Sequence, residues 1–489
     1  MDRPVNLEKT DVRPLELLTE VMPYASGLPG EPVPLGYSRS VHARVALALI
    51  LAATTPVGAD GIAIVGGSPR AIGRAGTATA SDDGGGALLV NPAAIARRDG
   101  TRVQLGVAFT DDSIEWDPDH ADGPIARDQA GSNTLPLAAV IGSIGSWVIG
   151  AGVMTAGVTQ RAFRDPNDVP RPEDLDAAFE YRYTGIAGSI RRDTLTIGVA
   201  RRIGDALAVG VSVGASRLEM TETRRLWAGF AGISAVGDPK RDVELSFAGQ
   251  DAFVPSATAG ILIAPVDTPM ELAASVAWTS RAEIEADVGA NGTSGGPLVR
   301  LQDPSAQLSF RQPVSVRVGA RYVGDWFAIE LNGDLWFAPR SAAKASWAVD
   351  GVRIVDPSTV GVDLVGVPSR LSQRTHGAIR ASLDVELIPG FLWATGGYAH
   401  TVGGTDRNRL SPTFGDLGGH TIALGIEGTA GGFTYTIGWS RTLSRDKRAP
   451  SELSLDNPFG AGDASVAAGS YDGTADQLGV LLDLELDAP

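Results

Sequence analysis

The sequence predicts an all-β fold, a transmembrane antiparallel β-barrel. Apolar and polar residues alternate with a period of two over much of the chain, as side chains do on the two faces of a strand. Many of these runs are about nine to eleven residues long, the length that a tilted strand needs to cross a bilayer. The chain also carries an export signal near its start. Together these features predict strands with one face toward lipid and the other toward a lumen.

The alternation is clearest in residues 313–322. Three Val, one Ala and one Tyr fall on one face of that predicted strand, and Ser, Gly and two Arg fall on the other. Similar alternation occurs in residues 102–110, 207–215, 379–387, 433–440 and 477–486. A large soluble β-sandwich or a secreted β-solenoid would also alternate. The strand lengths, the export signal and the lack of a repeat of about 20 to 50 residues count against both folds.

A secretory signal peptide is predicted near the start of the chain. Arg39 and Arg44 precede an apolar run at residues 45–53, and small residues follow it as far as Ala59. A basic region, a short apolar core and small residues before the cut are typical of such a signal. We expect residues 1–59 to form a leader that is cleaved after Ala59, with Ala63 as the alternative. The first 38 residues do not fit a signal and represent an over-long gene start or a cytoplasmic extension.

Composition excludes several classes of protein. The 489 residues contain no cysteine, so a disulfide scaffold and a thiolate metal site are impossible. A net charge of -16 argues against a nucleic-acid binder, which needs clustered Lys and Arg. We therefore expect no nucleic-acid partner, no metal and no cofactor. The 61 glycines, about 12% of the chain against a usual ~7%, show no collagen-like period and need another explanation.

The connections between predicted strands fall into two kinds. Short turns occur around residues 203–205, 265–268 and 323–325. Long polar segments occur at residues 111–132, 161–180, 225–241, 341–373 and 444–476. Outer-membrane barrels have short periplasmic turns and longer extracellular loops, so this difference predicts which end of the barrel faces outward.

Several motifs resemble those of one family. Residues 60–98 are rich in Gly and Ala and contain the motifs Arg70-Ala-Ile-Gly73, Asp82-Asp83 and Asn91-Pro92-Ala93-Ala94-Ile95. This segment resembles the N-terminal hatch of the FadL/TodX family of outer-membrane channels, although that family usually has Gly where Ala94 stands. Further resemblances lie at residues 276–281, 310–322, 396–399 and 417–425. They extend over most of the predicted mature chain.

The resemblance implies a fold and a function. It implies about 14 strands with a hatch at residues 60–101 inside a barrel at residues 102–489, in the outer membrane of a Gram-negative type cell. It also implies passive uptake of hydrophobic molecules, such as long-chain fatty acids or hydrocarbons, by a monomer. Lipid, lipopolysaccharide and the barrel-assembly machinery would be its partners. The alternative is a general porin or a structural outer-membrane β-protein without specificity for hydrophobic substrates.

Two features depart from this family pattern. Outer-membrane barrels commonly end in an aromatic residue, but this chain ends Leu486-Asp-Ala-Pro489. Aromatic residues make up only 6% of the chain, which is low for a barrel with two aromatic girdles.

No enzyme is expected. Gly210-Val-Ser-Val-Gly214 matches the G-x-S-x-G motif of hydrolases, but it lies within an alternating strand. A nucleophile elbow needs a turn between a strand and a helix. We therefore expect no catalytic residue.

Three groups of candidate site residues follow. In the hatch, Asn91, Pro92 and Ala93 are expected to fix a turn or to act as a hinge. Two polar connections carry apolar side chains that we expect to capture substrate; the alternative is that they only pack the loops. The first connection contributes Phe163 and Phe179, and the second contributes Leu226, Trp227, Phe230 and Ile233. The second has the spacing of a short amphipathic helix. In the lumen, Arg317, Arg321 and Arg380 would bind a substrate carboxylate or pair with Glu330, Asp334, Asp384 or Glu386.

Overall fold

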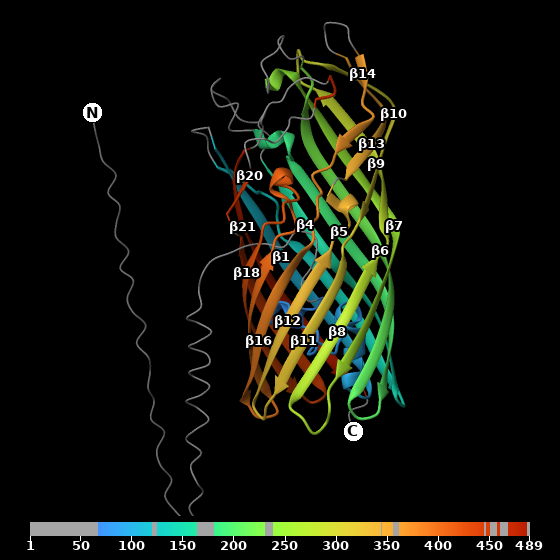
Figure 1. Cartoon of the computed structure of the whole chain (residues 1–489), viewed down its shortest axis with the longest axis vertical. Coiled ribbons are helices and arrows are strands. Elements are labelled where there is room, and N and C mark those ends of the chain that lie inside the picture. The colour runs from blue at the N-terminus through green and yellow to red at the C-terminus, as the bar shows by residue number, and fades with distance from the viewer. Residues whose placement is uncertain are drawn as a thin grey trace, which may run out of the picture. The chain divides into compact units, whose positions relative to one another are not determined.

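The fold is a closed antiparallel barrel of 14 strands, seen in a computed structural model of the chain (Figure 1). The structure describes residues 67–119, 125–163, 180–229, 238–343, 345–355, 361–444, 446–449, 457–459 and 468–486. The predicted leader and its cleavage sites lie outside these residues. Among the described residues, no helix has the length and apolarity needed to cross a membrane.

Fourteen passes of the chain make up the wall, each paired with antiparallel neighbours, and β1 closes the ring by pairing with both β3 and β21. β8 and β9 form one pass, and so do β10 and β11. The wall strands are β1 (Thr101–Pro118), β3 (Asn133–Ile144), β4 (Trp147–Ala162), β5 (Ala187–Ile203), β6 (Leu207–Trp227), β7 (Asp242–Ile263), β8 (Met270–Thr279), β9 (Arg281–Gly292), β10 (Leu298–Arg311), β11 (Val314–Val323), β12 (Phe327–Phe337), β16 (His376–Ile388), β17 (Leu392–Val402), β18 (Gly418–Ala430), β19 (Phe433–Ser444) and β21 (Gly469–Glu485).

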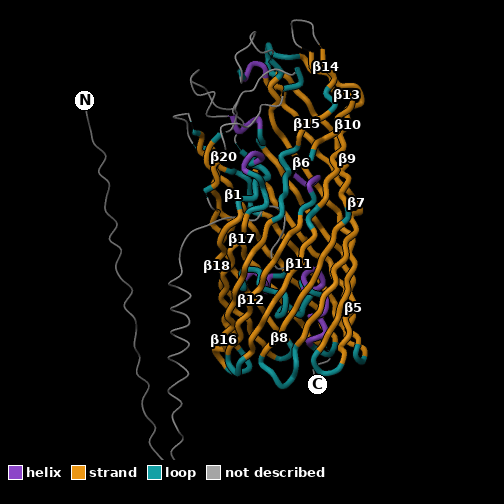
Figure 2. Tube along the Cα trace, in the orientation of Figure 1, coloured by secondary structure: helices purple, strands orange, loops and turns teal. Residues whose placement is uncertain are grey.

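Shorter elements extend the wall at one end or lie within the barrel. Five strands lie at the end away from the short turns: β2 (Ala126–Arg127), β13 (Ser346–Val355), β14 (Gly361–Asp363), β15 (Gly366–Pro368) and β20 (Lys447–Ala449). The helices are α2 (Pro69–Ile72), α3 (Ala87–Val90) and the 3-10 turns η1 (Pro92–Arg97), η4 (Pro239–Arg241), η5 (Arg340–Ala343) and η6 (Arg407–Arg409). Figure 2 shows the N-terminal helices inside the short-turn half of the barrel.

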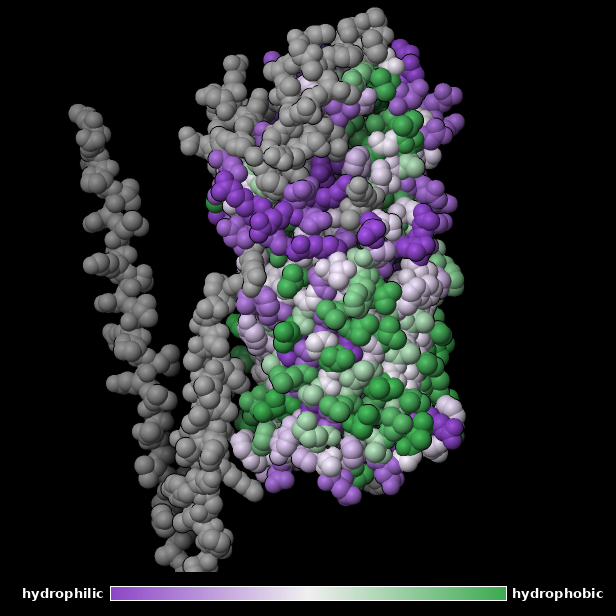
Figure 3. Space-filling view, in the orientation of Figure 1, coloured by the Kyte–Doolittle hydropathy of each residue, from purple (hydrophilic) through white to green (hydrophobic). Residues whose placement is uncertain are grey.

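The predicted alternation of faces is confirmed. On β6, Val211 and Val213 are more than half exposed on the outer surface, while Ser212 between them is buried in the lumen. Such outward side chains form an apolar belt around the short-turn half, and a hydrophilic ring lies beyond it (Figure 3). The predicted short turns all lie at one end, where the connections are residues 145–146, 204–206, 264–269, 324–326, 389–391 and 431–432.

The strands are longer than predicted. β6 has 21 residues and β7 has 22, so both continue well past the apolar belt. Much of what the polar composition indicated as loop is therefore strand, because a polar strand outside the bilayer needs no apolar face. The predicted helix over the second capture segment is wrong in its first part. Residues 223–227 continue β6 and pair with β7.

The N-terminal segment packs inside the barrel on glycines. A Cβ on Gly438 would lie 2.7 Å from the backbone nitrogen of Gly73, and one on Gly210 would lie 2.5 Å from that of Ala93. At such positions only glycine lets two backbones approach so closely. Glycines that approach the hatch backbone lie on several strands: Gly210, Gly397, Gly425, Gly438 and Gly479. At Gly106 and Gly198 the hatch atoms that lie close belong to side chains. The glycine excess therefore has a structural cause.

The opposite half of the lumen is also filled. Its core is apolar and includes Met220, Phe247 and Trp347, the last two with stacked rings 4.7 Å apart. The connection between β17 and β18, residues 403–417, folds inward, and Leu410 and Phe414 are fully buried. We call residues 403–417 the inward loop. The barrel is thus closed at two levels, by the hatch and by this loop.

Candidate functional site

Ion pairs fix the hatch to the barrel wall. Arg70 lies 2.9 Å from Asp83 within the hatch and 2.7 Å from Glu427 of β18. Arg97 donates to Glu271 of β8 at 2.8 Å. Arg74–Asp384 is a further pair between hatch and wall, and Asp83 also pairs with Arg98 of the hatch and with Arg102 of β1. Because buried charges need partners, these pairs specify how the hatch sits in the wall.

The hatch motif forms a capped turn, as expected for Asn before Pro. Asn91 Oδ1 accepts a hydrogen bond from the Ala93 backbone at 3.2 Å, which caps the 3-10 turn η1. Its Nδ2 donates to the carbonyl of Thr79 at 2.8 Å and to that of Ile261 in β7 at 3.2 Å. The Asn91 side chain thereby joins two parts of the hatch to the wall. Its role as a hinge stays a prediction.

The three predicted lumen arginines have different surroundings. Arg380 lies 2.8 Å from Asp334, and Arg321 lies 3.4 Å from Glu271 and 3.8 Å from Asp384. Arg317 forms no ion pair with any described residue, and its hydrogen bond is a long one, 3.5 Å to the carbonyl of Leu89. Arg317 is therefore the one of the three without an ion pair, although Asp334 of β12 lies opposite it in the ladder.

A chamber of about 140 Å³ lies between the hatch and the inward loop. Its floor is formed by Gly67, Leu89 and Val90 of the hatch. Asp416 of the inward loop lines it from the other side, with Gln373 and His376. The His376 ring stacks on Trp336, another lining residue, with the centroids 4.8 Å apart. Two arginines, Arg192 and Arg317, also line the chamber.

Arg192 is held in the chamber by neutral groups. Its Nε donates to Ser216 Oγ at 2.9 Å, and its Nη1 donates to Gln312 Oε1 at 2.8 Å. A weaker bond of 3.4 Å joins Nη2 to Thr279 Oγ1. No described carboxylate forms an ion pair with Arg192. A cation kept in a lumen by hydroxyl and amide oxygens retains its attraction for an anion.

Sequence reasoning did not identify Arg192, although a signal was available. In the alternating segment 187–203, Arg192 shares its face with Thr194 and Thr196, which are buried, whereas Leu195 and Ile197 are exposed. The alternation of side chains between the two faces of a strand would have placed Arg192 in the lumen and its neighbour Arg191 on the outer surface. The lack of a carboxylate partner could not be read from the sequence.

The wall has an unpaired seam beside this chamber. β3 pairs with β4 only up to Leu137 and Met154, whereas β4 continues to Ala162 with β5 as its partner. β4 is also irregular at Ala156, between Thr155 and Gly157, and Ala156 lines the chamber. A small cavity lined by Pro136, Met154 and Thr155 reaches the same place. We call this stretch, β4 residues 155–161 facing β3 residues 133–136, the seam.

The predicted capture residues lie partly outside the described residues. Phe179, Phe230 and Ile233 belong to segments that the structure does not describe. Phe163, Leu226 and Trp227 are buried, at 5%, 3% and 0% exposure. Phe163 packs with Trp116 and Tyr181, and Leu226 belongs to the apolar core of the outer half. The capture role of these side chains stays a prediction.

A closed barrel with an apolar belt and an internal N-terminal hatch defines a plugged transmembrane channel. Residues 50–313 match the family described as outer membrane protein transport protein (OMPP1/FadL/TodX). That is more than half of the chain, so the protein belongs to this family, as its motifs predicted. It is an outer-membrane transport channel and not an enzyme.

Solved structures support the fold. A FadL homologue of Pseudomonas aeruginosa matches with a TM-score of 0.66 and 14% identity, over 87% of this chain and 100% of its own. The toluene transporter TodX of P. putida matches with a TM-score of 0.64 and 14% identity, over 87% and 100%. The toluene transporter TbuX of Ralstonia pickettii matches with 0.59 and 14%, over 86% and 99%. A search of curated protein sequences gives no match.

Proposed function

We propose that this channel takes up hydrophobic molecules that carry one negatively charged head group, with long-chain fatty acids as the leading class. In this proposal uptake is passive. Apolar burial, worth about 25 cal/mol per Å², binds such molecules without a catalytic group. The family supports hydrophobic transport. Uncharged hydrocarbons, which the names of TodX and TbuX indicate for those proteins, are the second class.

The observation that carries this proposal is the pair of arginines in the chamber. Arg192 and Arg317 both face it, and neither forms an ion pair with a described residue. Trp336 and Leu89 supply apolar surface beside them. A carboxylate placed between the guanidinium groups gains charge-assisted hydrogen bonds while its chain packs on that surface.

We further propose a route through the channel. The substrate is captured at the outer end by the two segments that contain Phe163 and Trp227, and it passes the inward loop into the chamber. It then leaves sideways through the seam. This exit is supported by Ala156, which lines the chamber at the point where β4 has lost β3 as a partner. Lateral exit spares a hydrophobic molecule the aqueous periplasm.

The remaining parts of the proposal concern assembly. Residues 1–59 serve as a leader cleaved after Ala59, residues 60–101 form the hatch, and residues 102–489 form the barrel. The protein acts as a monomer within lipid and lipopolysaccharide after insertion by the barrel-assembly machinery. N-terminal sequencing of the mature protein tests the leader.

A comparison of two substrates tests the head-group specificity. In cells that lack this channel and express variants at equal surface levels, Arg192→Gln is expected to reduce uptake of radiolabelled oleate about tenfold, since a charged hydrogen bond is worth about 1.5–3 kcal/mol. Uptake of an uncharged hydrocarbon should not change. Arg441→Gln, an exposed arginine on the outer surface that pairs with Asp476, is the matched control.

Two outcomes would contradict the proposal. If the unmodified channel transports the hydrocarbon but not oleate, the assignment of an anionic substrate is wrong. If it transports neither, hydrophobic uptake itself is wrong.

A further inference from the structure

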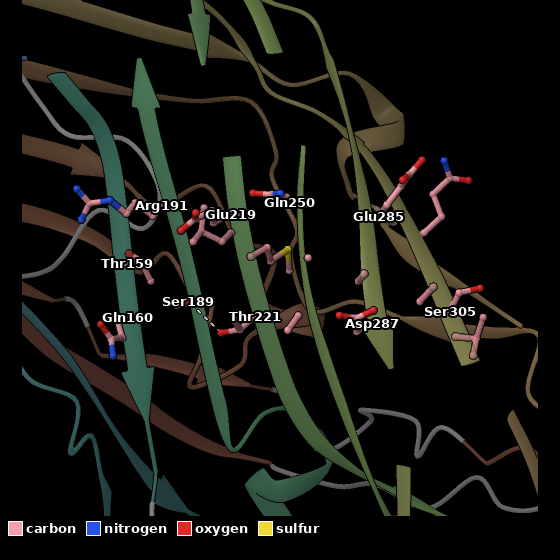
Figure 4. A pocket seen from close by; sticks show the side chains of 18 of the residues that line it. Thr159, Gln160, Ser189, Arg191, Glu219, Thr221, Gln250, Glu285, Asp287 and Ser305 are labelled. Carbon is pink, nitrogen blue, oxygen red and sulfur yellow. Dashed lines mark hydrogen bonds between the residues drawn. The ribbon is translucent and has the colours of Figure 1, made fainter. Parts of the chain in front are cut away.

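A cluster of polar side chains crosses the seam on the outer surface. Arg191 of β5 extends over the neighbouring strand β4, on which Thr159 and Gln160 are labelled (Figure 4). Its Nη2 donates to Thr155 Oγ1 of β4 at 3.0 Å, and its Nη1 donates to the carbonyl of Thr134 in β3 at 3.2 Å. We call Arg191, Asp193, Thr155 and Thr134 the clasp.

The clasp lies where backbone pairing ends. Most wall strands are joined by long ladders of backbone hydrogen bonds, but the described β3–β4 ladder stops at Leu137 and Met154. Thr134 and Thr155 lie just beyond that point, on opposite sides of the seam. The next outward residue of β5 toward the short turns is Leu195, which is 52% exposed in the apolar belt. The clasp therefore lies at the outer edge of the bilayer core.

Most hydrogen bonds of the clasp lie on the β4–β5 side of the seam. Asp193 holds Arg191 through Nε at 2.8 Å and accepts a bond from Thr155 Oγ1 at 2.6 Å. These three residues belong to β4 and β5, which are paired to each other. Among the described residues, only the bond to the Thr134 carbonyl reaches β3 from this group. Within the clasp, opening the seam therefore breaks one side-chain hydrogen bond and leaves the Arg191–Asp193 ion pair intact. Farther along β4, Thr159 and Arg161 also bond to Asp112 of β1.

We propose that Arg191 controls passage through the seam, as a positioning residue that holds β3 against β4 until a substrate displaces it. The inference rests on the lateral exit proposed above. Asp193 orients the guanidinium, so the arginine returns to the same place after each opening. Arg191 and Arg192 are consecutive, and they face the two sides of the wall at the two ends of this exit.

A labelling experiment measures seam opening directly. Because the chain has no cysteine, Ala156→Cys gives a single thiol beside the chamber at the seam. In proteoliposomes, a lipid-soluble maleimide should label it about fivefold faster when Arg191→Gln is added, as expected for the loss of one net hydrogen bond. Thr155→Val, which removes the hydroxyl that bonds both Arg191 and Asp193 but leaves their ion pair, should give a smaller increase. Arg441→Gln is the control, because its strand β19 is paired on both sides at that residue.

The outcomes separate the clasp from the transport function. Unchanged labelling in Arg191→Gln, with the barrel folded by its heat-modified mobility on gels, would overturn the clasp whatever the uptake results. Faster labelling without faster oleate uptake would support the clasp and count against the lateral exit. Loss of oleate uptake in Arg192→Gln tests the proposed substrate and does not depend on Arg191.

Discussion

The Nη1 atom of Arg192 lies 2.8 Å from Oε1 of Gln312, so a lumen guanidinium has an amide as partner where a carboxylate would neutralise it. The pair joins β5 to the residue between β10 and β11, across the chamber wall. A single change at residue 312 would therefore alter the charge of the chamber without altering its size.

Gln312→Glu is expected to abolish most uptake of anionic substrates. The new carboxylate would pair with Arg192 and repel the substrate head group, and we expect oleate uptake to fall by at least about tenfold. Uptake of an uncharged hydrocarbon should stay within about twofold. Gln307→Glu, on the outer surface of β10, is the control. Equal loss for both substrates would point to misfolding instead of charge.

Gly438→Val is expected to dislodge the hatch. Its Cβ would lie 2.7 Å from Gly73 N and from the Pro69 carbonyl, both of which are backbone atoms that cannot turn aside. A single cysteine at Ser81 in the hatch should then react faster with a maleimide in detergent, whereas conductance should stay low because the inward loop still closes the other half of the lumen. Gly333→Val, where the nearest atom would be 3.5 Å away, should leave the labelling rate unchanged. Equal labelling rates in both variants would mean that the hatch tolerates the displacement.

Asn91→Ala is expected to loosen the hatch by about 2–4 kcal/mol. It removes three hydrogen bonds and leaves the carbonyls of Thr79 and Ile261 without this donor, and each loss costs about 1 kcal/mol or more. A single cysteine at Ser81 should then react faster with a maleimide in detergent. Unchanged reactivity would mean that the ion pairs alone hold the hatch. Slower uptake without faster labelling would instead favour a hinge.

Lys447 is expected to make the inward loop sensitive to pH. This lysine lies outside the bilayer and donates to the carbonyl of Asp416 at 3.0 Å. Burial lowers its pKa from 10.5 to about 8, Asp416 and Asp406 oppose that shift, and Arg374 and Arg407 add to it. The folded state therefore releases the proton before the unfolded chain does. The docked loop gains stability as the pH rises from about 8 toward 10.5, and below pH 8 the full cost of burying the charge remains.

A label on the loop measures this effect. The fluorescence anisotropy of a dye attached to Asn408→Cys should rise between about pH 7.5 and about pH 9.5, the range around the shifted pKa. The rise would show that the loop becomes less mobile. Lys447→Met should remove most of that change, because it carries no proton to lose. A pH response that persists in Lys447→Met would assign the titration to another group.

The fold followed from the sequence because the physics of strands in a bilayer is local. Alternate residues such as Val211 and Ser212 show which face meets lipid, and the short turns show where strands reverse. Strand ends were harder to predict. Residues 223–227 look like part of a polar loop with helical spacing, but pairing with β7 makes them strand. That pairing is a long-range effect that no local pattern contains.

The candidate site was predicted less completely. The alternation of strand faces predicted that Arg317, Arg321 and Arg380 lie in the lumen. Whether each forms an ion pair depends on residues from strands distant in sequence, such as Glu271 beside Arg321. The alternation of faces could have located Arg192, but neither its neutral partners nor the clasp could be predicted, for the same reason. The seam cannot be predicted from the sequence of β4 alone. The alternating pattern of β4 continues past the residue at which its pairing with β3 stops.

The closure of the ring between β1 and β21 sets an order of assembly. The hatch helix η1 ends at Arg97 and β1 begins at Thr101, so three residues tether the plug to the first strand. β1 meets the last strand along its whole length, from Arg102 with Glu485 to Pro118 with Gly469. The hatch backbone packs too closely against the wall glycines to enter a barrel that has already closed. It must already be inside when the first and last strands meet, so the final pairing step of folding also encloses the hatch.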